Sequence, residues 1–135
     1  MLDEHTDIDR IRDYFSKDVF ATERTGATIR EAGKGFAVCE RELQSHHRNA
    51  HGGVMGGAIF TLADFALAVA CNVGQAPTVS VENSIRYLSG AKGSHLIATA
   101  QTDKLGRSLC FFTVDVVDEL GTNVATMTAT CFRAG

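Results

Sequence analysis

One carboxylate stands apart from its surroundings in the sequence. Asp64 lies within residues 55–72, where Ala, Leu, Ile, Phe and Val occupy most of the other positions. This run predicts a helix over about 57–72 that is apolar on every side and is therefore buried by the rest of the fold. An unpaired buried carboxylate is energetically costly. Asp64 is therefore either a structural residue with its own hydrogen-bond donors or a reactive group, and a reactive carboxylate can act as a general base or as a nucleophile.

A pair of glycines at the start of the same helix offers the complementary chemistry. Gly56 and Gly57 precede the apolar run. The N–H groups of a first helical turn have no partner inside the helix and lie at the positive end of its dipole. Because glycine has no side chain, a substrate can approach these amides closely. They could stabilise negative charge that develops on a carbonyl oxygen, although close helix packing is an alternative role for the pair.

The spacing of these groups has a consequence for assembly. Asp64 follows Gly56 by eight residues, which corresponds to about 12 Å along one helix. That distance is too long for both groups of one chain to act on a single carbonyl group. If both act, the site must combine two chains, so we expect a homodimer with shared sites.

The remaining elements are predicted to wrap this helix. Residues 6–17 have apolar positions at helical spacing, and residues 44–54 are a polar loop that leads into the central helix. The segments with strand-like composition are 27–32, 36–43, 78–88, 95–102, 109–117 and 123–132. The first two form a hairpin, and the last four are joined by turns, which predicts an antiparallel meander. The expected fold is α+β: a curved antiparallel sheet wrapped around one long central helix.

Composition limits the function classes. A chain of 135 residues is expected to form one domain over 1–135. The net charge of −3 and the lack of a basic block argue against nucleic-acid binding, and the apolar run is too short for a membrane span. The first ten residues do not resemble a secretory signal, and the four cysteines lack C-x-x-C spacing, so we expect a cytoplasmic protein with free thiols. No residues have metal-ligand spacing, so no metal site is expected.

These features together resemble the hotdog fold, and the local sequence resembles the PaaI-type acyl-CoA thioesterases. The resemblance covers about residues 36–133. The core motif of that family is Asn, often His two residues later, then His-Gly-Gly, and finally Leu-Ala-Asp in the helix. Counting back from Asp64 places the glycine pair of the motif at Gly56-Gly57, with its leading residues at Asn49 and His51. In this register Met55 stands where the family usually has histidine.

The resemblance implies roles for individual residues. The Gly56 N–H would polarise the thioester carbonyl, Asn49 would hold the carbonyl or a water, and Ser80 would orient the water near Asp64. His51 and Gly57 would contact the substrate. Each has a structural alternative as well, for example a turn residue at position 49 or an ordinary strand serine at position 80.

The implied activity is hydrolysis of an acyl-CoA thioester to free acid and CoA without a cofactor. The acyl group would be aryl, phenylacetyl-type or medium-chain, and the homodimer would pair again into a homotetramer. Two alternatives remain. A non-catalytic acyl-CoA-binding module would normally carry a fused partner domain. A hotdog dehydratase or hydratase would need a histidine paired with the helix acid, and no loop histidine here stands in such a motif.

Overall fold

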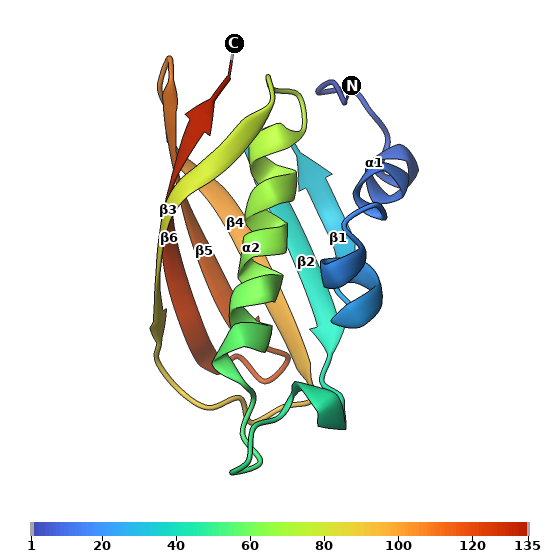
Figure 1. The fold of residues 1–135 in the computed structure, drawn as a ribbon, viewed down its shortest axis with the longest axis vertical. Coiled ribbons are helices and arrows are strands. Elements are labelled where there is room, and N and C mark those ends of the chain that lie inside the picture. The colour runs from blue at the N-terminus through green and yellow to red at the C-terminus, as the bar shows by residue number, and fades with distance from the viewer. Residues whose placement is uncertain (1, 135) are drawn as a thin grey trace.

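The computed structural model describes residues 2–134. Its helical elements are α1 (Ile8–Phe15), the π-helical turn η1 (Phe20–Arg24), the 3-10 turn η2 (Ser45–His47) and α2 (Gly56–Asn72). Its strands are β1 (Thr28–Gly33), β2 (Phe36–Glu42), β3 (Thr78–Tyr87), β4 (His95–Leu105), β5 (Leu109–Asp118) and β6 (Asn123–Arg133). The strands form one antiparallel sheet in the order β1-β2-β4-β5-β6-β3. The sheet curves around α2, as Figure 1 shows, so the expected α+β architecture is confirmed.

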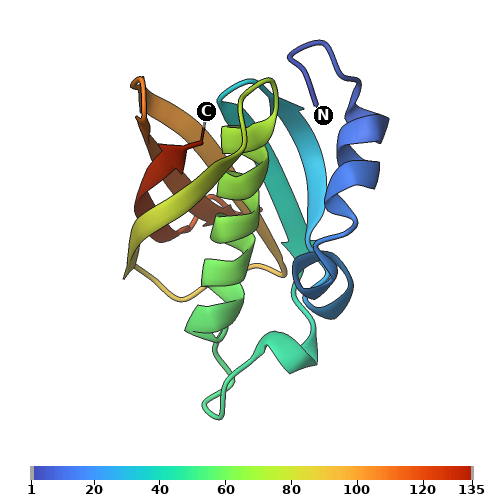
Figure 2. The same cartoon turned by 45° about the horizontal axis from the view of Figure 1, so that its top comes forward.

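The predicted meander of the last four strands is partly wrong. β4, β5 and β6 do form a meander, but β3 pairs with β6 at the far edge of the sheet and not with β4. The physical reason lies in residues 88–94, which are too long for a tight hairpin and instead cross one end of the sheet (Figure 2). The buried Asp118 carboxylate holds this crossing, because it accepts the N–H groups of Lys92 (2.8 Å) and Gly93 (2.9 Å). Burial alone would raise the pKa of Asp118, but these backbone donors hold it well below its usual value.

The central helix matches the prediction within one residue. It begins at Gly56 and ends at Asn72, whose side chain donates to the Thr78 carbonyl (3.1 Å) and accepts from the Thr78 N–H (2.9 Å). This exchange fixes the start of β3 directly after the helix. The N-terminal helix is shorter than the predicted 6–17, because the Asp7 side chain caps it by accepting the Arg10 N–H.

The sheet does not cover α2 on every side. The residues that face the sheet, such as Leu62, Ala66 and Val69, are fully buried. A stripe on the other side is only partly buried, and we call it the open stripe: Phe60, Thr61, Asp64 and Ala68. The expectation that one chain buries this helix all round therefore fails along the open stripe, where the described chain supplies only part of the cover.

No helix in residues 2–134 is both long and apolar enough to cross a lipid bilayer.

The outer edge of β3 is apolar and unpaired. β3 ends the sheet, and the side chains of Val79 and Val81 are 61% and 60% exposed. A β-bulge between Ser80 and Glu82 shifts the register of this strand against β6. An exposed apolar strand edge is a ready surface for association with another chain.

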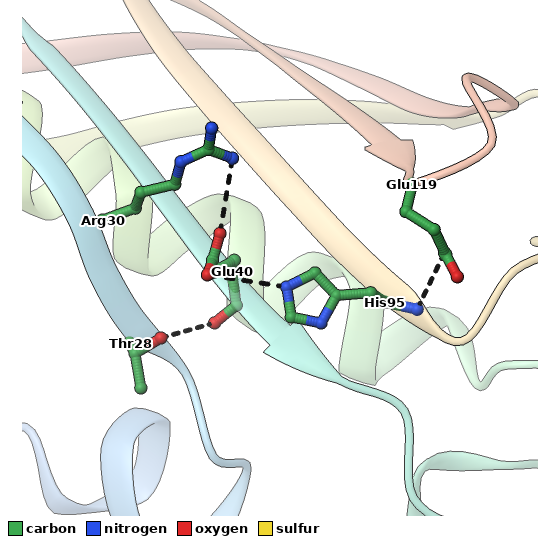
Figure 3. Close-up of polar contacts among 5 residues, drawn as sticks. All are labelled: Thr28, Arg30, Glu40, His95 and Glu119. Carbon is green, nitrogen blue, oxygen red and sulfur yellow. Dashed lines mark hydrogen bonds and ion pairs between the residues drawn. The ribbon is translucent and has the colours of Figure 1, made fainter.

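The face of the sheet that points away from α2 carries a polar cluster. Cys39 and Arg41 are buried on the helix side, so Glu40 between them points to the opposite face. There its carboxylate lies 3.5 Å from Arg30 and 3.6 Å from the His95 ring (Figure 3). These partly exposed contacts contribute little stability, and they are separated from Asp64 by the sheet itself.

Candidate active site

Asp64 projects from the middle of α2 toward β3. Its carboxylate accepts a long hydrogen bond (3.5 Å) from the Asn83 side-chain amide. No ion pair with a basic side chain is formed by Asp64 within residues 2–134. Burial, and then repulsion by Asp18, raise the pKa of Asp64, while the Asn83 amide opposes this effect. A carboxylate with a raised pKa is a stronger base than one in water, which suits proton abstraction.

Ser80 and Asn83 lie on the same face of β3 because of the bulge. Ser80 is opposite Cys131, and Asn83 is opposite Ala129, and both of these β6 residues are buried toward the helix. Strict alternation from Ser80 would instead have placed Asn83 on the outer face. Ser80 forms no hydrogen bond to Asp64 within the described chain, whereas Asn83 does. Asn83 was missed by sequence reasoning, since a bulge has no sequence signal in this strand.

The first turn of α2 leaves its amides free. Met55 is the N-cap and provides no side-chain hydrogen bond. Within residues 2–134 the N–H groups of Gly56 and Gly57 have no acceptor, while the Gly56 carbonyl accepts the hydroxyl of Tyr87 (3.0 Å). A Cβ added at Gly56 would lie 3.1 Å from the Tyr87 ring, so this position has no room for a branched side chain. The geometry suits stabilisation of an oxyanion by backbone amides.

Asn49 and His51 lie in the tight loop that precedes α2. The Asn49 side chain accepts the N–H groups of His51 (3.0 Å) and Gly53 (3.1 Å). Gly52 in this loop has a φ of +86°, a conformation that favours glycine. The His51-Gly52-Gly53 sequence thus belongs to the loop, and only Gly56-Gly57 opens the helix. In this chain Asn49 has the turn-forming geometry, with its side-chain N–H₂ group still available to a ligand.

Two buried residues that sequence reasoning missed hold this loop against the fold. Arg41, only 2% exposed, donates through Nη2 to the Ala58 carbonyl (2.7 Å) in the first turn of α2, and burial lowers its pKa to about 10. His47 is 4% exposed, and its Nδ1 accepts the Gln44 N–H (2.9 Å). Its Nε2 must therefore carry the proton and donate to the Thr25 carbonyl (2.8 Å). The His47 carbonyl also accepts the Met55 N–H, which links this anchor to the helix start.

We expect His47 to make the stability of this loop depend on pH. Burial, followed by repulsion from Arg41, lowers the pKa of His47, so the fold favours the neutral ring. The stabilisation is complete above the unfolded pKa of about 6.5 and is lost as the pH falls below it. The variant His47→Asn should be about 1–3 kcal/mol less stable than the native protein at pH 8, the range for a lost buried hydrogen bond.

That stability difference should become smaller as the pH falls from 8 to 5, in urea unfolding series. The matched control is His51→Asn, because His51 is exposed in the same loop. It should leave the free energy of unfolding at pH 8 within about 0.5 kcal/mol of the native value, as surface substitutions usually do. A constant difference for His47→Asn would contradict the neutral assignment.

Within one chain the expected site residues form two separate groups. Asn49, His51, Gly56 and Gly57 gather at the N-terminal end of α2, as the lower part of Figure 1 shows for this loop and helix end. The second group lies farther along the helix: Asp64 on α2 is directed toward β3, and Ser80 is on the face of β3 that is directed toward α2. No hydrogen bond joins the two groups within residues 2–134. No cluster of three or more metal-ligating side chains is found in that part of the chain either.

Comparison with known proteins assigns the family. A family model described as the thioesterase superfamily matches residues 51–125, more than half of the chain and the stretch that holds most of both groups. The chain belongs to the thioesterase superfamily. Human acyl-coenzyme A thioesterase 13 is 37% identical to this thioesterase over 95 residues, 68% of each chain. The Escherichia coli acyl-coenzyme A thioesterase PaaI is 32% identical over 82% of this chain and 79% of that protein.

Solved structures agree with the fold of this thioesterase. The structure of E. coli PaaI, from the phenylacetic acid degradation operon, matches with a TM-score of 0.83 and 25% identity, over 96% of this chain and 97% of that one. A hypothetical thioesterase of Streptococcus pneumoniae, solved with coenzyme A, matches with a TM-score of 0.82 and 25% identity, over 90% and 97% of the two chains. The resemblance to PaaI-type hotdog thioesterases is therefore confirmed.

Proposed function

We propose that the protein is an acyl-CoA thioesterase in which Asp64 activates the hydrolysis and the Gly56 N–H stabilises the oxyanion. The observation that carries this proposal is a half-buried carboxylate with a raised pKa, on an otherwise apolar helix, in a chain of this family. Its relatives are named acyl-coenzyme A thioesterases, which supports the CoA thioester as substrate.

The reaction needs only groups of the protein and water. As a general base, Asp64 takes a proton from water while the water oxygen attacks the thioester carbon, and the carbonyl oxygen becomes negative next to the Gly56 N–H. The C–S bond then breaks, and CoA leaves as a thiol after it takes up the proton. As a nucleophile, Asp64 would attack the thioester carbon, and the C–S bond would break to release the CoA thiolate, which takes up a proton from water. Water would then hydrolyse the resulting mixed anhydride to the free acid and regenerate the Asp64 carboxylate. Asn83 and Ser80 would orient the carboxylate and the water, and Asn49 would hold the carbonyl or the water.

Each site is proposed to combine two chains. Gly56 and Asp64 are about 12 Å apart along α2, too far for both to act on one thioester from the same chain. The open stripe and the apolar edge of β3 are also at least partly exposed in the single chain, and contact with a second chain would bury them. A two-fold dimer would bring Asn49, His51, Gly56 and Gly57 of one protomer to Asp64 and Ser80 of its partner. We propose that these dimers pair again into a homotetramer in the cytoplasm.

Subunit mixing tests the shared site. The variants Asp64→Asn and Asn49→Ala are each expected to be inactive, and they are unfolded together in equal amounts and refolded. Half of the dimers should be mixed, and each mixed dimer should hold one native and one doubly altered site. About a quarter of the native activity should therefore return, as random two-fold pairing requires. If subunits exchange, shown by two distinguishable tags, and no activity returns, the site is built within one chain.

A thiol-release assay with a panel of acyl-CoA substrates tests the activity and the acyl group. The cavity beside Asp64 is lined largely by aromatic and aliphatic side chains, among them Phe60 and Phe65. This lining supports an aryl, phenylacetyl-type or medium-chain acyl group over a short or charged one. No thiol release from any member of the panel would contradict the proposed hydrolysis.

A further inference from the structure

A second acid faces the cavity beside Asp64. This cavity, about 420 Å³ in volume, lies between α2 and the segment that enters η1. It is lined by Asp18, Val19, Phe20, Ala21, Phe60, Thr61, Asp64, Phe65 and Ala68. The acids come from two elements far apart in the sequence, and the rest of the lining is apolar except for Thr61. None of the nine lining residues is basic, so no cation in the lining neutralises the two carboxylates.

The surroundings of Asp64 show that Asp18 is its principal charged neighbour. From β3 it faces the neutral Asn83 amide, and from β6 the Cys131 thiol, which also feels the Asp64 charge. From the segment before η1 it faces Asp18, which contributes to the raised pKa of Asp64 after burial. The carboxylate of Asp18 forms no hydrogen bond or ion pair within residues 2–134, although its backbone carbonyl accepts from Thr22. A structural role for this carboxylate is therefore not visible in its contacts.

We propose that Asp18 is a positioning residue of the reaction, whose negative charge acts on Asp64 and repels the carboxylate product from their common cavity. This inference depends on the proposed role of Asp64. An acyl thioester is neutral at its reacting end, whereas the free acid formed by hydrolysis is an anion at neutral pH. Two carboxylates without a neighbouring cation do not repel the neutral thioester, but they do repel the anionic product. The charge of Asp18 therefore keeps Asp64 basic before the reaction and promotes product release after it.

The variant Asp18→Asn tests the inference in the full-length protein. The amide is nearly isosteric, and the side chain that it replaces makes no hydrogen bond, so the fold should be retained. The inhibition constant of the free acid product should fall about three- to tenfold, the size of a Coulomb interaction between partly solvated charges. Because the pKa of Asp64 should fall without its acidic neighbour, the acid limb of the kcat/KM profile should move to lower pH. The matched control is Asp13→Asn, an exposed acid of α1 outside the cavity, which should change neither quantity.

A measurement on the native protein tests the repulsion of the product by the two carboxylates together, and the Asp18→Asn variant assigns the share of Asp18. The free acid and the corresponding primary amide, which is neutral, are compared as inhibitors at low and high salt. High salt screens partly exposed charges, so it should tighten binding of the acid and leave that of the amide unchanged. Equal inhibition constants for the acid in native and Asp18→Asn protein, with an unmoved acid limb, would overturn the inference. Since Asp64→Asn would still be inactive in that case, this outcome is distinct from failure of the proposed function.

Discussion

Replacing Asp64 by Asn is expected to lower kcat by at least about 100-fold, the usual scale for loss of a general base. The amide cannot take a proton from water or attack the thioester at neutral pH. It can still accept from the Asn83 amide, so the geometry around the position should be preserved. The measurement is thiol release at saturating acyl-CoA. Full hydrolysis by a folded variant would contradict the catalytic role of Asp64 and assign the activation of water to another group.

The same substitution should not cost stability. Burial raises the pKa of Asp64, so the native fold disfavours the ionised form. This cost to the folded state is present at neutral pH, decreases as the pH falls through the raised folded pKa, and is absent below the unfolded pKa of about 3.9. At pH 7 the Asp64→Asn variant should therefore have a Tm equal to or higher than that of the native protein. Loss of activity with retained Tm separates a chemical role from a structural one.

The variant Gly56→Val is expected to reduce kcat by about 100- to 1,000-fold, the range for removal of one oxyanion donor. A Cβ at this position would lie 3.1 Å from the Tyr87 ring, and the branched side chain would also crowd the free amide. Both effects displace the backbone that faces the thioester carbonyl. The assay is again thiol release, with circular dichroism to verify the fold.

Two controls separate the amide from its surroundings. Tyr87→Phe removes the hydrogen bond to the Gly56 carbonyl but leaves the Gly56 N–H in place, so kcat should change little. Gly53→Ala tests the other glycine pair, because a Cβ there meets only Asn49 at an ordinary 3.7 Å. Gly52 is unsuitable as a control, since its φ of +86° would strain any other residue. A larger loss at Gly53 than at Gly56 would assign the family motif to His51-Gly52-Gly53.

The central helix was predictable because its signal is local. Apolar residues at nearly every position predicted residues 57–72, and the structure has Gly56–Asn72. The same local pattern located Asp64 and the glycine pair. The four cysteines were also predicted as free thiols, and the structure has all four free and buried.

Features that depend on partners distant in the sequence were not predictable. Asn83 reaches Asp64 only because a bulge in β3 shifts the alternation of that strand. In the sequence Arg41 and His47 are ordinary polar residues of a strand end and a loop. In the structure both are buried, and each donates a hydrogen bond to a backbone carbonyl of another segment. The place of β3 depends on a crossing held by Asp118, a contact that no pattern within residues 78–88 encodes.

The position of β3 also determines the order in which the site can be assembled. In the described sheet β3 pairs only with β6, and the partners lie from 38 residues (Tyr87 with Ala125) to 55 residues (Thr78 with Arg133) later in the chain. In the sheet β6 pairs with β5 on one side and with β3 on the other, and β4 and β5 connect this pair to the first hairpin. Such long-range pairing is slow, because loop-closure entropy is lost before the contacts form. We therefore expect the half of the site around Asp64 to be completed late in folding, after the helix and the first hairpin.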